Sequence, residues 1–186
     1  MLEKLNRIKL LAMDVDGVLT DGSMVYGSES EIKLFNVMDG LGIRLAIAAG
    51  LEIAWITGNV SAPVTARAKS LMVAELYQGQ RYKSVALKEI AGRKGLLLDE
   101  VAYIGDDLND LPAIEAAGAA FAVANAASEV KTSADFITER SGGHGAVREV
   151  IEMILKQQGR WDDGVQKLLE LLRAEQERGE APGAVT

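Results

Sequence analysis

Two aspartates, Asp14 and Asp16, are the residues of this sequence whose type and spacing most clearly suggest chemistry. They follow an apolar run, residues 8–13, which is broken only by Lys9 and is typical of a buried parallel strand. Because side chains alternate along a strand, two such carboxylates can converge only where the strand ends and the backbone turns. Paired carboxylates repel each other unless a cation lies between them, and a hard divalent ion such as Mg²⁺ meets that need.

Three further polar residues stand at places where such a pair would find partners. Thr57 lies near the end of a second strand-like run, residues 52–59, and Asp106 directly follows a third run, residues 100–105. Lys83 lies near the start of a predicted helix. Doubly wound sheets bind ligands outside the carboxyl ends of their strands, so we expect these side chains to meet there.

The order of the elements predicts an α/β fold built on a doubly wound parallel sheet, because apolar runs of strand length alternate with helical periodicity. The predicted strands span residues 8–13, 52–59, 73–77, 100–105, 119–124 and 136–137. The predicted helices span residues 39–50, 62–71, 81–94, 111–117 and 145–157. We expect Asp39 to cap the first of these helices and Val85, Leu87 and Ile90 to lie in the core.

Two segments fall outside that alternation. Residues 22–37 predict a projecting β-hairpin with its loop at 27–31, which is too short to form a separate cap domain. Residues 161–178 predict a charged amphipathic helix, which could pack on its own subunit or, as we favour, on a partner. Residues 179–186 are small and include Pro and Gly, so we expect a flexible tail. The predicted organisation is one catalytic domain, residues 1–160, followed by this helix and tail.

Composition limits the metal, the partners and the location that we expect. The 186 residues include no Cys and one His, so any metal must be held by oxygen, which favours Mg²⁺. The net charge of −7 argues against a nucleic-acid surface. No stretch has the length and apolarity of a signal peptide or a membrane span, so we expect no membrane association and a cytoplasmic location.

Four motifs, taken in their order, resemble the haloacid dehalogenase (HAD) superfamily of phosphatases. They are Asp14-Val-Asp16-Gly-Val-Leu-Thr-Asp-Gly, then Ile-Thr57-Gly, then Lys83 at a helix start, then Gly-Asp106-Asp107-Leu-Asn-Asp110. Three longer stretches, at residues 35–40, 76–80 and 142–149, are similar to a capless branch of that superfamily. This branch contains 3-deoxy-D-manno-octulosonate 8-phosphate (KDO 8-phosphate) phosphatase. The resemblance covers nearly all of residues 8–158.

The resemblance implies a role for each of the acidic motif residues. Asp14 would be the nucleophile and would form an aspartyl-phosphate. Asp16 would protonate the departing alkoxide and then deprotonate the attacking water. Mg²⁺ would be bound by the Asp14 carboxylate, the backbone carbonyl of Asp16 and Asp106.

The same resemblance assigns supporting roles to the remaining motif residues. Thr57 would donate a hydrogen bond to the phosphoryl oxygens, and Lys83 would offset the negative charge of Asp14 and the phosphate. Asp107 or Asp110 would orient Lys83 or the water bound to the metal. From the residues alone, Lys83 could equally be a solvated lysine, Thr57 a strand-end cap and Asp110 the N-cap of the next helix.

The resemblance further implies a homotetramer that hydrolyses a phosphorylated sugar acid, KDO 8-phosphate, in lipopolysaccharide biosynthesis, with a neighbouring subunit closing each site. Met38, Asn59 and His144 stand where the family commonly has arginine, the residue suited to bidentate binding of a carboxylate. A phosphatase of nine-carbon sugar-acid phosphates or of broader sugar phosphates is therefore an alternative. The candidate substrate contacts are Gly58, Asn59, Arg67 and His144.

A non-enzymatic alternative is a receiver domain of a signalling protein. Such domains also gather an acidic cluster, a threonine and a lysine around a phosphorylated aspartate. In a receiver the acidic residues precede the threonine and the lysine, whereas Asp106 and Asp107 follow both here. The order of the motifs therefore favours the phosphatase.

Overall fold

A computed structural model of the chain describes residues 2–26 and 31–178. Within these residues, six strands form one sheet in the order β5-β4-β1-β6-β7-β8, and every neighbouring pair is parallel. The strands are β1 (Leu10–Met13), β4 (Glu52–Ile56), β5 (Glu75–Tyr77), β6 (Val101–Gly105), β7 (Ala119–Ala122) and β8 (Phe136–Ile137). The predicted α/β class with a doubly wound parallel sheet is therefore confirmed.

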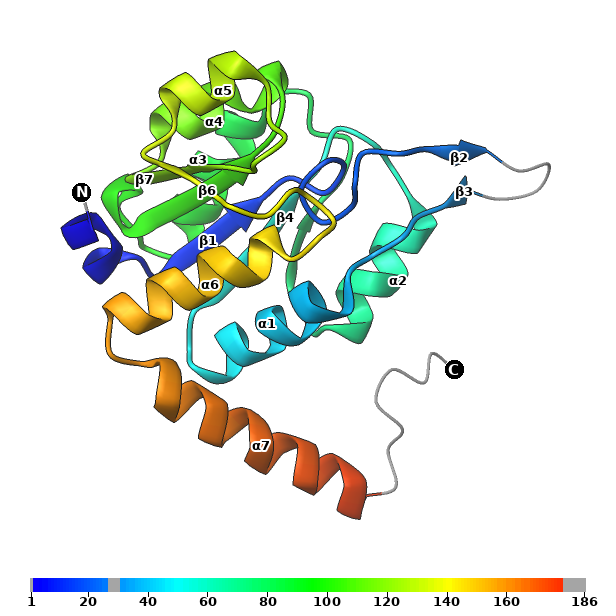
Figure 1. Ribbon diagram of the computed structural model, residues 1–186, viewed down its shortest axis with the longest axis vertical. Helices are drawn as coiled ribbons and strands as arrows, with labels where there is room; N and C mark the ends of the chain where they lie inside the picture. Colours follow the sequence, from blue (N-terminus) through cyan, green and yellow to red (C-terminus); the bar gives the residue numbers. More distant parts are fainter. Residues whose placement is uncertain (1, 27–30, 179–186) are drawn as a thin grey trace.

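Helices cover both faces of this sheet (Figure 1). On one face lie α1 (Val37–Ala48) and α6 (Ala146–Gln157), and on the other lie α3 (Lys83–Arg93), α4 (Leu111–Ala116) and α5 (Ser128–Ser133). The further helices are α2 (Ala62–Ser70), α7 (Trp161–Glu177) and the short 3-10 turns η1 (Leu2–Arg7), η2 (Leu98–Glu100) and η3 (Leu108–Asp110). Because both faces are covered, central strands such as β1 and β6 are buried at every position, which explains why they read as unbroken apolar runs.

The strand order changes direction at β1. From β1 the chain passes to β4 and β5 on one side, and it then returns to β6, β7 and β8 on the other side. Such a switch point opens a crevice outside the carboxyl ends of the central strands, because the connections leave in opposite directions. The fold therefore provides a place for a ligand above β1, β4 and β6.

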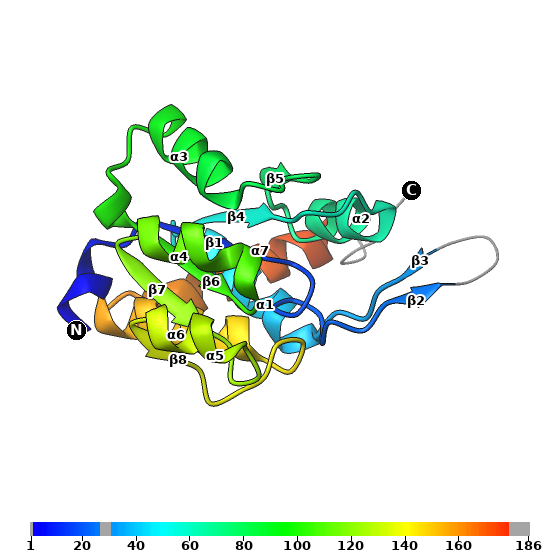
Figure 2. The same cartoon turned by 90° about the horizontal axis from the view of Figure 1, so that it is seen from above.

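A two-stranded hairpin projects from the body of the domain beside this crevice (Figure 2). Strand β2 (Val25–Tyr26) pairs antiparallel with β3 (Glu31–Ile32), in the segment where the sequence predicts a hairpin. Most of the predicted loop, residues 27–30, and the predicted tail, residues 179–186, lie outside the described residues.

Asp39 does not cap its own helix, so that prediction is wrong. Helix α1 begins at Val37, and Asn36 caps it by accepting a hydrogen bond of 2.8 Å from the Met38 N–H. The Asp39 carboxylate instead accepts hydrogen bonds from the N–H groups at the start of α6, from Gly145 over 3.2 Å and from Arg148 over 2.7 Å. The first N–H groups of a helix have no partner within it, and a buried carboxylate satisfies two of them here.

Two expectations about helix faces are also wrong. Val85 is 62% exposed, because α3 begins at Lys83 and its buried side is formed by Lys83 together with alanine, leucine and isoleucine residues. Helix α7 packs on α1 of its own chain, whereas the sequence analysis favoured packing on a partner. Gly164 permits this packing, because a Cβ there would lie 2.9 Å from the Ala49 side chain.

Candidate active site

The carboxyl ends of three adjacent strands bring predicted site residues together. Asp14 directly follows β1, Thr57 follows β4 and Asp106 follows β6. A cavity of about 540 Å³ lies over these strand ends, and all three residues line it. Four more of the predicted residues line the same cavity, namely Asp16, Gly58, Asn59 and Asp107.

Four lining residues were missed by the sequence analysis. They are Gly22, Gln80, Arg81 and Asn109. Gln80 ends the stretch at residues 76–80 that is similar to the capless branch, Arg81 follows it, and Asn109 belongs to the motif that contains Asp106. These residues thus lie in or beside stretches that the sequence analysis identified, but a motif does not show which of its residues face the ligand.

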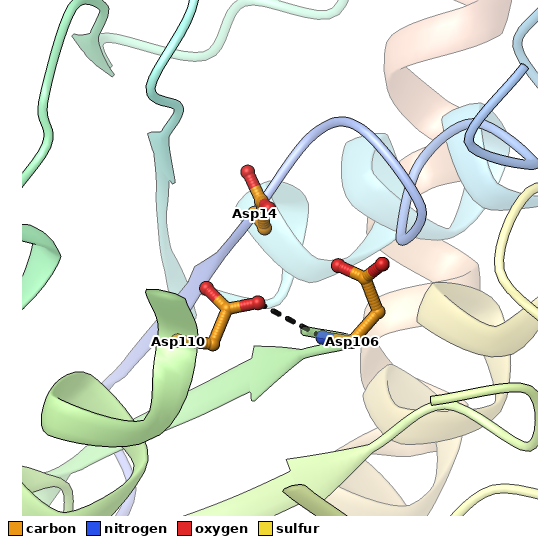
Figure 3. A group of neighbouring side chains, drawn as sticks. All are labelled: Asp14, Asp106 and Asp110. Atoms are coloured by element: carbon orange, nitrogen blue, oxygen red, sulfur yellow. Dashed lines mark hydrogen bonds between the residues drawn. The ribbon is translucent and has the colours of Figure 1, made fainter. Parts of the chain in front are cut away.

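Asp14, Asp106 and Asp110 form a carboxylate cluster in which one oxygen of each lies within 4.8 Å of the others (Figure 3). Asp14 is 5% exposed and Asp110 is fully buried. Burial and then the charge of Asp110 raise the pKa of Asp14 to about 7, although Lys83 opposes the shift. Burial and then the charge of Asp14 raise the pKa of Asp106 to about 8. The cluster therefore carries negative charge that is only partly compensated by the protein.

Lys83 supplies the protein's own compensation. Its Nζ lies 2.5 Å from Asp14 Oδ2 and 2.7 Å from Asp110 Oδ1, and its side chain is only 1% exposed. Burial alone would lower the pKa of Lys83, but the two carboxylates hold it above its ordinary value. A charged ammonium group thus lies directly beside the predicted nucleophile, and the alternative of a solvated helix lysine does not describe this residue.

Asp110 holds Lys83 and the backbone at Asp106 in place through hydrogen bonds. Its Oδ1 accepts hydrogen bonds from Lys83 and from the Tyr103 hydroxyl, both over 2.7 Å. Its Oδ2 accepts from the N–H of Asp106 over 2.9 Å and of Asp107 over 3.3 Å. Both oxygens are therefore engaged by the protein, and the side chain makes no capping bond to α4. Asp107 itself faces the cavity and accepts a hydrogen bond of 2.7 Å from the Leu108 N–H.

The donor set fits a hard divalent cation. The buried Oδ1 of Asp106 has no hydrogen-bond partner among the described residues, so a ligand-binding oxygen is available next to Asp14. Gly17 provides the room, because a Cβ at this residue would lie 2.0 Å from Asp106 Oδ2. All donors in the cluster are carboxylate oxygens, which suit Mg²⁺ better than softer metals.

Asp16 is held by two side chains from other segments. Asn59 donates a hydrogen bond of 3.0 Å from its amide to Asp16 Oδ2. Lys33, which follows β3 in the hairpin, forms an ion pair with Asp16 Oδ1 and a second one of 3.0 Å with Glu31. The Lys33 side chain is 1% exposed, and the sequence analysis missed it because a lone lysine in a hairpin carries no signal. The predicted acid–base residue is therefore fixed at both oxygens.

Thr57 is 1% exposed, and its geometry is compatible with both functions that the sequence left as alternatives. Its Oγ1 accepts a hydrogen bond of 3.3 Å from the Asn59 N–H, which holds the turn after β4. A hydroxyl that accepts one hydrogen bond still has its own proton to donate. Since Thr57 lines the cavity, that proton can be offered to an oxygen of a ligand.

Two of the predicted substrate contacts lie outside the cavity lining. Arg67 of α2 packs over the Phe35 ring at 5.9 Å and beneath Gly40, where a Cβ would lie 2.2 Å from its guanidinium. His144 makes a hydrogen bond of 2.9 Å between Nδ1 and the Gly142 carbonyl within its own loop. Neither residue reaches the carboxylate cluster within this chain.

Comparisons with known proteins agree with the geometry of this site. The sequence model of the haloacid dehalogenase-like hydrolase family matches residues 53–151. The 3-deoxy-D-manno-octulosonate 8-phosphate phosphatase KdsC of Salmonella typhi is 42% identical over 164 residues, which cover 88% of this chain and 87% of that protein.

Solved structures of the same kind of protein superpose closely. The phosphatase of that name from Moraxella catarrhalis, solved with magnesium, phosphate and KDO, has a TM-score of 0.86 and 45% identity over 89% of this chain and 95% of its own. The one from Yersinia pestis has a TM-score of 0.85 and 41% identity over 87% of this chain and 88% of its own. The similarity therefore extends over nearly the whole length of both relatives.

Proposed function

This chain belongs to the haloacid dehalogenase-like hydrolases and is a phosphatase of the KDO 8-phosphate phosphatase type, and we propose that it hydrolyses KDO 8-phosphate through a phosphorylated Asp14. The observation that carries the mechanism is the buried contact between Lys83 and Asp14, because Asp14 and further carboxylates line the cavity. Phosphate monoesters hydrolyse very slowly in water, so a catalyst must position the ester and offset its charge. A buried aspartate paired with a buried lysine supports both tasks.

In the first step an oxygen of Asp14 attacks the phosphorus of the substrate, and the bond between phosphorus and the sugar oxygen breaks. Asp16 gives its proton to the departing sugar oxygen, so the sugar leaves as a neutral alcohol. Asn59 and Lys33 hold the Asp16 carboxyl in place for this transfer. Lys83 offsets the charge that gathers between Asp14 and the phosphoryl group.

In the second step Asp16, now a carboxylate, takes a proton from a water molecule. The water oxygen attacks the phosphorus, the bond from phosphorus to Asp14 breaks, and inorganic phosphate is released. Asp16 regains the proton that it gave away, so the enzyme returns to its starting state. Thr57 supports both steps by donating its hydroxyl proton to a phosphoryl oxygen.

The metal ion of this mechanism is Mg²⁺, and its ligands would be the carboxylates of Asp14 and Asp106 with the backbone carbonyl of Asp16. Asp110 is the third member of the cluster, but both of its oxygens are already engaged, whereas Asp106 Oδ1 is free of partners among the described residues. When bound, Mg²⁺ supplies positive charge to the phosphoryl oxygens and to Asp14. We therefore assign Asp110 to the positioning of Lys83.

The substrate assignment rests on the relatives, which carry the name of this activity at 41–42% identity. One observation in the site favours testing other sugar phosphates as well. Asn59 stands where the family commonly has arginine, and its amide is turned to Asp16. A nine-carbon sugar-acid phosphate or a neutral sugar phosphate is thus the alternative substrate.

The direct test is release of inorganic phosphate from a panel of substrates in the presence of Mg²⁺. The panel contains KDO 8-phosphate, a nine-carbon sugar-acid phosphate, D-arabinose 5-phosphate and D-glucose 6-phosphate. The proposal expects the highest kcat/KM for KDO 8-phosphate. Equal or higher values for the neutral sugar phosphates would contradict the substrate assignment while leaving the phosphatase chemistry intact.

We propose further that the chain assembles as a homotetramer in which a neighbour's hairpin closes each site. Support comes from apolar side chains that face solvent in the single chain, since Leu34 is 72%, Val37 78% and Val60 81% exposed. Light scattering should give a tetramer. A fully active monomer would contradict closure by a neighbour.

No described helix is long and apolar enough to cross a membrane, and the cytoplasmic location stays a prediction.

A further inference from the structure

The cavity poses an electrostatic problem for a substrate that carries a carboxylate as well as a phosphate. Its lining includes the carboxylates of Asp14, Asp16, Asp106 and Asp107. Mg²⁺ and Lys83 would offset the negative charge of the phosphoryl group. A second anionic group on the departing sugar would still be repelled by the carboxylates of the lining. A cation that is free to bind it must therefore lie near the cavity.

Most cations around the cavity already have a partner in the chain. Lys83 is shared by Asp14 and Asp110, and Lys33 is shared by Asp16 and Glu31. Both of these lysine side chains are 1% exposed, and each is shared by two carboxylates of the protein.

The arginines that flank α1 are likewise engaged. Arg67 packs on Phe35 and beneath Gly40, away from the cavity lining. Arg148 forms an ion pair of 2.7 Å with Glu152 and lies over the Trp161 ring at 5.1 Å.

Arg81 differs from all of these cations. It lines the cavity, it is exposed, and within the described part of the chain it has no ion pair or hydrogen bond from its side chain. It lies two residues before Lys83, in the segment that leads from β5 into α3. The same stretch of backbone therefore carries Lys83, which contacts the lining residue Asp14 from its buried side, and Arg81, which lines the cavity itself.

We propose that Arg81 binds the carboxylate of the sugar-acid substrate and thereby sets the preference for acidic over neutral sugar phosphates. This inference rests on the proposed function, because it names the residue that recognises that substrate. In KDO 8-phosphate the carboxylate and the phosphate lie at opposite ends of the carbon chain. Arg81 and Lys83 are separate cations, one lining the cavity and one beside Asp14, so the two acidic groups need not compete for one positive charge.

The chemistry of the side chain suits this task. Guanidinium donates two parallel hydrogen bonds to a carboxylate, which adds direction to the charge attraction. The three positions at which the family commonly has arginine hold Met38, Asn59 and His144 here, and methionine and asparagine offer no positive charge. Arg81 would supply in this chain a charge that those positions lack.

The test compares Arg81→Gln with the wild-type enzyme on KDO 8-phosphate and on D-arabinose 5-phosphate, which has no carboxylate. The expected result is a rise in KM for KDO 8-phosphate of about ten- to hundredfold, from the loss of a charge-assisted contact, with kcat within about twofold. The kinetics with D-arabinose 5-phosphate should not change. Arg81→Lys should recover part of the affinity, because it restores the charge without the paired donors.

Lys88→Gln is the matched control, because Lys88 is an exposed cation of α3, the helix that follows Arg81, and does not line the cavity. It should leave both substrates unaffected. If Arg81→Gln lowers kcat/KM equally for both substrates, or changes neither, the inference is wrong. If the wild-type enzyme itself shows no preference for the sugar acid, the proposed function fails as well, and the two failures are distinguished by the wild-type data alone.

Discussion

Lys33 of the hairpin forms an ion pair with Asp16, which follows the proposed nucleophile Asp14 by two positions. The Lys33 side chain is 1% exposed, and it also contacts Glu31 on β3, the strand directly before it. The projecting hairpin is therefore anchored in the active site by a buried charge. We expect this contact to position Asp16 for its proposed acid–base role. This role can be tested by comparing substrates whose leaving groups differ in their need for a proton.

Replacing Lys33 by Met should lower kcat for alkyl phosphates by about tenfold or more, because a displaced Asp16 no longer protonates the sugar oxygen. The effect on p-nitrophenyl phosphate should be much smaller, because its leaving group departs without a proton. Lys9→Met is the control, since Lys9 pairs with Glu100 at the surface. An equal loss on both substrates would point to general damage of the fold and would contradict this role.

Asp110 should matter for stability as well as for activity. Asp110→Ala leaves Lys83 buried with one partner fewer and leaves the Tyr103 hydroxyl unsatisfied, so we expect a loss of about 3–5 kcal/mol of unfolding free energy. Tyr103→Phe removes only one hydrogen bond and should cost about 1 kcal/mol. Urea unfolding measures both values. Equal costs for the two variants would contradict the central position of Asp110.

Gly17 should be intolerant of any side chain. Its φ is +90°, and a Cβ would lie 2.0 Å from Asp106 Oδ2, so Gly17→Ala should cost more than about 1 kcal/mol and weaken the binding of Mg²⁺. Gly92→Ala is the matched control, because nothing lies within 4 Å of a Cβ in that exposed helical position. It should stabilise the protein by about 0.5–1 kcal/mol. Calorimetry and Mg²⁺ titration of both variants test the contrast.

The free energy of unfolding of the metal-free, EDTA-treated protein should fall as the pH rises. The pKa values of Asp14 and Asp106 in the fold, about 7 and about 8, exceed the ordinary value of 3.8, because burial and then the charge of neighbouring carboxylates disfavour their charged forms. The stability that their protonated forms contribute is complete below the ordinary pKa, and it is lost as pH rises through the raised values.

The binding of Mg²⁺ should reverse that loss, because the ion binds the deprotonated carboxylates. Adding Mg²⁺ to EDTA-treated protein should therefore raise Tm more at about pH 8.5 than at about pH 6. Scanning calorimetry with and without the ion measures the two gains. A larger gain at the lower pH would contradict the assignment of this cluster as the metal site.

The sheet and the main site could be predicted because local patterns determine them. Apolar runs of strand length placed Asp14, Thr57 and Asp106 after three strands, and a parallel sheet then forces those ends to one edge. The family resemblance also implied that Asp107 or Asp110 orients Lys83 or the water bound to the metal, and it left the two residues as alternatives. Only the structure shows that Asp110 is the one that contacts Lys83.

Contacts between distant segments could not be predicted in this way. Asp39 caps α6, which begins more than a hundred residues later in the chain, and nothing near Asp39 in the sequence distinguishes this from a local cap. Lys33 reaches Asp16 only because the hairpin folds back over the end of β1. Such contacts depend on how whole elements pack, so a periodicity or a motif does not contain them.

The most direct test of the account is the activity of Asp14→Asn on KDO 8-phosphate with Mg²⁺ present. An amide of nearly the same shape should leave the fold intact, as circular dichroism can verify, but it cannot form the aspartyl-phosphate. The account predicts no phosphate release above background from this variant, while wild-type enzyme turns over. Phosphate release at the wild-type rate would show that Asp14 is not the nucleophile and would contradict the mechanism at its centre.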